Sequence, residues 1–149
     1  MGIKLIFLDI DGVLNNESTR ARAPNSAIGI NVGMVSIFKR IIEETDAKIV
    51  LSSAWRLYPK IHDYLWENLG QDLKDRCIGM TPCSLSDYRG REIEQWLESN
   101  KHIEIDSFII LDDCNDMQPY MDRLIQTSWR TGITNDHVDR AIEMLNNVK

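Results

Sequence analysis

Hydrophobic residues follow two different patterns along this chain, and each pattern predicts one kind of element. Short apolar runs rich in branched residues are typical of strands that are buried on both faces of a sheet. They occupy residues 3–8, 47–51, 76–80, 107–111 and 123–127. Elsewhere, apolar residues recur every three or four positions, which predicts amphipathic helices. These helices are expected at residues 32–46, 59–69, 92–98 and 138–148.

The alternation of strands and helices predicts the fold class. A strand, a helix and a second strand form a right-handed crossover, and repeated crossovers build a parallel sheet with helices on both faces. We therefore expect an α/β protein with a three-layer, Rossmann-like arrangement. The polar segment 15–31 is expected to be a surface loop. No repeat or linker divides the sequence, so residues 1–149 are expected to form one domain.

Polar clusters follow three of the predicted strands. They are Asp9-Ile10-Asp11, Ser52-Ser53 and Asp112-Asp113. In parallel sheets, ligands bind outside the carboxyl ends of the strands. The three clusters are therefore expected to meet at one edge of the sheet, and that edge is the predicted active site.

Aspartates dominate this predicted site. The five that belong to it or follow it closely are Asp9, Asp11, Asp112, Asp113 and Asp116. Two negative charges about 4 Å apart repel by roughly 4 kcal/mol at an effective dielectric constant of about 20, so the cluster requires a counter-charge. Carboxylate oxygens are ligands that favour Mg²⁺. The alternative for Asp113 and Asp116 is that they only cap turns or helices, as aspartates often do.

The spacing of the first two aspartates suggests their chemistry. Residues two apart in a strand point to the same face, so Asp9 and Asp11 are expected to point the same way. Gly12 permits a sharp departure from the strand and a close approach of backbone to a ligand. One carboxylate is then placed to attack a phosphorus atom while the other handles the proton of the leaving group.

At this point the chain resembles the haloacid dehalogenase (HAD) superfamily, whose phosphatases open with the pattern DxDGV at the end of the first strand. Asp9-Ile10-Asp11-Gly12-Val13 matches that pattern, and Ser52 matches the second motif. The third motif is a Lys or Arg just before a helix, for which Arg89 fits best and Arg91 is the competing candidate. Asp112 and Asp116 match the fourth motif.

The resemblance implies a magnesium-dependent phosphatase that works through an aspartyl-phosphate. Asp9 would be the nucleophile and Asp11 the general acid and base. Ser52 would hydrogen-bond a phosphoryl oxygen, and Arg89 would neutralise the transferring group. The implied metal ligands are the Asp9 carboxylate, the Asp11 main-chain carbonyl and Asp112, with Asp113 and Asp116 orienting the water ligands. The further residues expected to bind substrate are Gly12, Ser53, Arg56 and Arg91.

A narrower resemblance concerns the substrate. The stretches SSAWR (52–56) and RGREI (89–93) are similar to small phosphatase-like domains of phage and bacterial multifunctional RNA-repair proteins. This implies a nucleotide or a nucleic-acid 3′-phosphate end as substrate. The segments after the first and second motifs are too short for a large cap domain. An open site of this kind suits a bulky substrate, or it requires a partner protein to close it.

Bulk properties exclude some classes and leave others open. The net charge of −6 argues against a protein that coats nucleic acid, and the longest apolar run is far short of the ~20 residues of a membrane span. The three cysteines are expected to be reduced thiols of a cytoplasmic protein. Most of the four tryptophans are expected in packing, with Trp55 beside the site. The alternatives to a phosphatase are a phosphoryl-accepting receiver and a non-catalytic binding module on the same fold.

Overall fold

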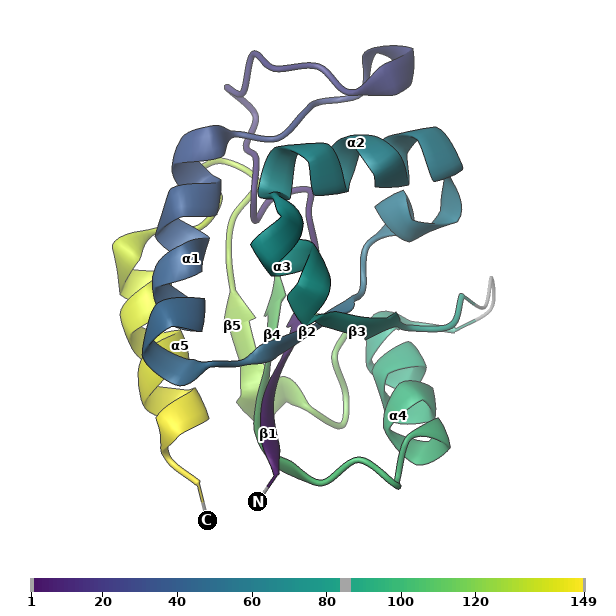
Figure 1. The fold of residues 1–149 in the computed structure, drawn as a ribbon, viewed down its shortest axis with the longest axis vertical. Coiled ribbons are helices and arrows are strands. Elements are labelled where there is room, and N and C mark those ends of the chain that lie inside the picture. The colour runs from purple at the N-terminus through teal and green to yellow at the C-terminus, as the bar shows by residue number, and fades with distance from the viewer. Residues whose placement is uncertain (1, 84–86, 149) are drawn as a thin grey trace.

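The computed structural model describes residues 2–83 and 87–148, and its centre is a parallel sheet (Figure 1). The five strands lie in the order β3-β2-β1-β4-β5, and every neighbouring pair is parallel. Their bounds are Ile3–Leu8 for β1, Lys48–Leu51 for β2, Cys77–Met80 for β3, Ile105–Asp112 for β4 and Leu124–Gln126 for β5. The predicted parallel α/β fold is confirmed.

Helices cover both faces of this sheet (Figure 1). Their bounds are Val32–Thr45 for α1, Pro59–Leu69 for α2, Gln71–Arg76 for α3, Arg89–Ser99 for α4 and Asn135–Asn146 for α5. Helices α1 and α5 pack side by side on one face, and α4 covers the other. Short 3-10 turns lie at Pro24–Ser26, Ala54–Leu57 and Met121–Arg123.

Alternating side chains of β1 build two separate cores. Ile6 and Leu8 belong to the larger cluster, which α1, α2, α3 and α5 complete. Leu5 and Phe7 point to the opposite face and pack with α4, where the Phe7 ring meets the Trp96 ring edge-on at 5.6 Å between centroids. Because β1 contributes side chains to both clusters, nearly all of its residues are apolar, as expected for a parallel sheet covered on both faces.

Among the described residues, neither the segment after the first motif nor the segment after the second motif forms a cap domain. In the loop after β1, the described chain forms only the 3-10 turn Pro24–Ser26 before α1 begins. Between β2 and β3 the chain forms the turn Ala54–Leu57, α2 and α3, and the buried Leu65, Leu69 and Leu73 of these helices join the larger core. The carboxyl end of the sheet is thus not covered by a separate folded unit within the described residues. None of the helices described is both long enough and apolar enough to cross a membrane.

Candidate active site

Strands β2, β1 and β4 are neighbours at the centre of the sheet, and their carboxyl ends lie side by side. Leu8, the last residue of β1, is in register with Leu51 of β2 and with Leu111 of β4. The hydrogen-bond ladder continues one step further, because the Asp9 N–H donates to the Leu111 carbonyl (3.0 Å) and the Ser52 N–H to the Leu8 carbonyl (2.8 Å). The three predicted polar clusters therefore leave the sheet at the same edge.

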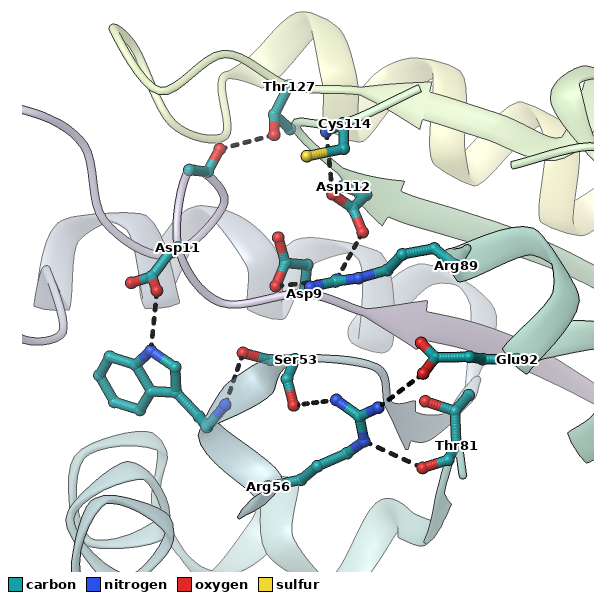
Figure 2. A network of polar contacts seen from close by, with 12 residues as sticks. Asp9, Asp11, Ser53, Arg56, Thr81, Arg89, Glu92, Asp112, Cys114 and Thr127 are labelled. Atoms are coloured by element: carbon teal, nitrogen blue, oxygen red, sulfur yellow. Dashed lines mark hydrogen bonds and ion pairs between the residues drawn. The ribbon is translucent and has the colours of Figure 1, made fainter. Parts of the chain in front are cut away.

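At the centre of this edge, one guanidinium lies between two carboxylates (Figure 2). Arg89 Nη1 lies 3.2 Å from Asp9 Oδ1 and 2.8 Å from Asp112 Oδ2. The Asp9 and Asp112 side chains are almost completely buried, whereas the Arg89 side chain is 23% exposed. Asp9 directly follows β1, Asp112 is the last residue of β4, and the cation between them, Arg89, is the first residue of α4.

Asp116 fixes the start of α4 and thereby the position of Arg89. Its Oδ2 accepts a hydrogen bond from the Arg89 N–H (3.3 Å), and its carbonyl accepts one from the Gly90 N–H (2.9 Å). Gly90 has to be glycine here, since a Cβ would lie 2.2 Å from the Gln118 carbonyl oxygen. Arg91 instead pairs with Glu94 on an exposed part of α4. Of the two third-motif candidates, Arg89 is the one that faces the carboxylates.

Burial has the largest effect on the pKa of each of the two acids. Burial raises the pKa of Asp9 well above its ordinary value, and the nearby Asp112 raises it further, while Arg89 opposes both. Burial likewise raises the pKa of Asp112, to about 6, against the lowering effect of Arg89. Burial alone lowers the pKa of Arg89, but the two carboxylates outweigh it and the net shift is upward. One cation is thus shared by two buried acids, and a second cation would be stabilised beside them.

Asp11 has different neighbours. Strand β1 ends at Leu8, so the alternation of side chains along a strand does not extend to Asp9 and Asp11. Asp9 faces Arg89, whereas the exposed Asp11 accepts hydrogen bonds from Asn15 Nδ2 (2.9 Å) and from Trp55 Nε1 (3.1 Å). Figure 2 shows the Asp9 carboxylate beside the Arg89 guanidinium and the Asp11 carboxylate pointing away from it. The prediction that both carboxylates point the same way was wrong, because the chain leaves the extended conformation between them.

Gly12 shapes the loop that follows. Its φ of +81° is in the region that favours glycine, and a Cβ on it would lie 2.3 Å from Asp113 Oδ2. Its N–H donates to Asn15 Oδ1 (2.9 Å), and its carbonyl accepts from Thr127 Oγ1 (2.6 Å). Both backbone groups are thus engaged within the protein, and the side on which a Cβ would lie is occupied by Asp113.

Three of the predicted site residues, Ser52, Ser53 and Arg56, lie in the segment after β2. Ser52 is buried, and its Oγ has no hydrogen-bond partner within residues 2–83 and 87–148. Ser53 Oγ accepts the Trp55 N–H (3.1 Å) and caps the turn Ala54–Leu57. The Arg56 side chain is only 5% exposed; its Nε donates to the Thr81 carbonyl (2.9 Å) and its Nη2 lies 3.5 Å from Glu92 Oε2. Substrate contacts were expected from Ser53 and Arg56, but their polar groups hold the rim of the site together.

The loop after β4 provides oxygen ligands. The Asp112 and Asp113 carboxylates and the Cys114 thiol can place one ligand atom each within 4.8 Å of one another. Asp116 Oδ1 is buried without a hydrogen-bond partner in the described chain, and a buried polar atom of this kind normally has one. Carboxylate oxygens around a partly compensated charge are the donor set that Mg²⁺ prefers, so the residues present fit a magnesium ion.

Sequence patterns pointed to the acids and Arg89 but not to their supports. Asn15 is fully buried in a segment expected to be a surface loop, and no periodicity marks it. Trp55 is buried beside the site, as its place in SSAWR suggested, but its contact with Asp11 depends on the turn conformation. Trp129, which was expected in packing, is 40% exposed in a turn. Its backbone carbonyl accepts a hydrogen bond from the Glu17 N–H (2.9 Å).

Comparison with known proteins agrees with this geometry. The model of one family, described as the HAD domain in Swiss Army Knife RNA repair proteins, matches residues 5–138. No curated protein and no solved structure matches the chain significantly. The matched region begins inside β1 and ends inside α5, so it contains the acids after β1 and β4, Ser52 and Arg89. The chain therefore belongs to the family of HAD domains found in Swiss Army Knife RNA repair proteins.

Proposed function

We propose that this protein is a magnesium-dependent phosphohydrolase that cleaves phosphate monoesters through an aspartyl-phosphate on Asp9. The observation that carries the proposal is the Arg89 guanidinium bridging the buried Asp9 and Asp112 at the carboxyl ends of β1 and β4. Phosphoryl transfer requires mainly positioning and compensation of negative charge. A buried nucleophile beside a fixed guanidinium provides both.

The reaction follows in two steps. Asp9 attacks the phosphorus, the ester P–O bond breaks, and the departing oxygen takes a proton from Asp11. Asp11, now a carboxylate, then removes a proton from water, which attacks the phosphorus of the aspartyl-phosphate and frees Asp9 and inorganic phosphate. The Ser52 hydroxyl, which has no hydrogen-bond partner among the described residues, would donate to a phosphoryl oxygen.

Magnesium would be held at the same edge by the Asp9 carboxylate, the Asp11 main-chain carbonyl and Asp112, with Asp113 and Asp116 orienting water ligands. Bound there, Mg²⁺ neutralises part of the acidic cluster and of the phosphoryl group. The raised pKa values of Asp9 and Asp112 are consistent with this need for a cation, since repulsion between the two acids contributes to that of Asp9.

The substrate class we propose is a nucleotide or a nucleic-acid 3′-phosphate end. The RNA repair proteins named in the matched family support this choice. The open edge of the sheet suits a large substrate. In addition, the exposed Trp129 and Arg130 lie in a turn that hydrogen bonds join to the loop after Asp11. Exposed aromatic rings and arginines are typical contacts for single-stranded nucleic acid. A partner protein that closes the site remains part of the proposal.

The test is phosphate release with Mg²⁺ from p-nitrophenyl phosphate, nucleoside 5′- and 3′-monophosphates and an oligonucleotide with a 3′-phosphate. Asp9→Asn should reduce release at least about a thousandfold, because the nucleophile is lost. Asp63→Asn, the same change at an exposed position of α2, should leave it unchanged. Preference for the oligonucleotide would support end processing. A stable phosphoryl group on Asp9 without turnover would contradict a phosphatase and favour a receiver.

A further inference from the structure

Two buried donors hold the carboxylate of Asp11 from two different parts of the chain. Asn15 Nδ2 donates to Asp11 Oδ1 at 2.9 Å, and Trp55 Nε1 donates to Asp11 Oδ2 at 3.1 Å. Asn15 is 0% and Trp55 5% exposed, whereas Asp11 itself is exposed. The exposed acid is thus held by two donors that are themselves buried in the protein.

The orientation of the Asn15 amide is fixed by its other contacts. Its Oδ1 accepts the Gly12 N–H (2.9 Å), and its Nδ2 also donates to the Gly29 carbonyl (3.1 Å). Rotation of the amide by 180° would place oxygen against two acceptors, Asp11 and Gly29, and nitrogen against a donor. Asn15 therefore presents a donor to Asp11 in the only orientation that satisfies all its neighbours.

Trp55 is held as firmly. Its backbone N–H donates to Ser53 Oγ (3.1 Å), and its ring packs against the Tyr64 ring with 6.1 Å between centroids. The Tyr64 hydroxyl in turn accepts the Ile30 N–H (3.2 Å), which ties α2 to the loop before α1. An indole N–H only donates and does not exchange a proton with a carboxylate near neutral pH, so Trp55 has no part in proton transfer except to hold Asp11.

We propose that Trp55 and Asn15 are positioning residues that fix the Asp11 carboxylate for its proton transfers. This inference rests on the proposed function, in which Asp11 is the general acid and base. Each Asp11 oxygen accepts one hydrogen bond from the protein and keeps a second lone pair for a proton. The two rigid donors therefore restrict the direction in which the exposed carboxylate offers that lone pair, which is the requirement for an efficient general acid.

A leaving-group comparison tests this role. A p-nitrophenolate ion leaves without a proton, whereas the sugar hydroxyl of an oligonucleotide 3′-phosphate requires one, and kcat/KM reports the step in which the ester bond breaks. Trp55→Phe keeps an aromatic ring and removes the indole N–H. It should lower kcat/KM for the oligonucleotide about tenfold, the effect of losing roughly 1.4 kcal/mol, and change that for p-nitrophenyl phosphate less than about threefold.

Trp66→Phe is the matched control. Trp66 is 7% exposed, and its Nε1 donates to His62 Nε2 (3.1 Å) within α2, so the same atoms are removed away from Asp11. Both of its kcat/KM values should match those of the wild type. Equal losses for both substrates in Trp55→Phe would indicate a merely structural role and overturn the inference, as would no loss at all.

An independent readout separates this inference from the proposed function. The four tryptophans give four indole N–H signals in a ¹⁵N NMR spectrum, and Trp55→Phe identifies the Trp55 signal by its loss. Asp11→Ala should shift this signal and leave that of Trp66 in place. An unmoved Trp55 signal would overturn the inference even in an active enzyme. A wild-type chain that releases no phosphate from either substrate would overturn the proposed function and the catalytic role of this contact together.

Discussion

The charge balance of the site depends on a single side chain among those described, Arg89. Replacing Arg89 with Ala leaves Asp9 and Asp112 buried without their cation, so in the presence of EDTA the free energy of unfolding should fall by about 2 kcal/mol, less than for a fully buried pair because Arg89 is 23% exposed. Phosphate release should fall at least about a hundredfold. Urea unfolding and the phosphate assay measure the two effects.

Arg91→Ala provides the comparison for that change, since it removes the same charge two residues away. The side chains of Arg91 and Glu94 are 39% and 31% exposed, and solvent screening makes the contribution of such a surface pair to stability small. Similar losses of stability and activity in the two variants would contradict the assignment of Arg89 to the site.

Single residues of the site differ in how well the sequence predicts them. Asp9 and Asp112 could be predicted because each follows a buried apolar strand, and the ends of parallel strands coincide. The position of the Arg56 side chain could not be predicted. A place shortly after β2 is equally compatible with an exposed contact to a phosphate and with the buried pairing with Glu92 that the structure has. The path of the chain after β2 decides between the two, and the spacing of hydrophobic residues does not predict that path.

At the scale of elements, predictions succeed where one face of an element is apolar. The bounds of helices α1 and α2 match their predicted ranges closely. Helix α3 was missed because Leu73 is the only buried residue of its polar sequence QDLKDR. Helix α4 begins at Arg89, three residues before its predicted start, since its first turn faces the polar site rather than the core. Val148 was placed on the last helix, but α5 ends at Asn146 and Val148 is 45% exposed.

The N-terminal cap of α5 makes stability depend on pH. Thr134 is the N-cap residue, and His137 Nδ1 accepts the Thr134 N–H (3.0 Å), which an unprotonated nitrogen alone can do. Burial, and then the nearby Arg140, lower the pKa of His137 below its ordinary 6.5. The folded state therefore binds this proton less readily than the unfolded chain, so the stabilisation is complete above about pH 6.5 and is lost as pH falls through the folded pKa.

His137→Gln isolates this contribution, because Gln also completes a capping box and does not titrate. The wild type should lose more unfolding free energy than His137→Gln when urea denaturation at pH 8 is compared with pH 5. Identical losses in both proteins would show that His137 does not contribute, since the remaining titrating groups are common to the two.

At the scale of the whole molecule, the strand order accounts for the site. Strand β1 lies between β2 and β4, so acids about a hundred residues apart in sequence leave the sheet side by side. The hydrophobic pattern predicts a parallel sheet but contains no information on which strands are neighbours. The sequence predicts only that the polar clusters share the carboxyl edge of the sheet, and the order of the strands along that edge comes from the structure.

Gathering these acids in a chain of net charge −6 predicts that Mg²⁺ stabilises the fold. A ligand that binds only the folded state at a hundred times its Kd adds about 2.7 kcal/mol, so Mg²⁺ should raise the Tm relative to EDTA. Asp112→Asn removes a buried carboxylate at the centre of the cluster and should abolish this rise. Asp63→Asn makes the same change of charge on α2 and should retain it. An equal rise in both variants would mean that Mg²⁺ acts on overall charge rather than at this edge of the sheet.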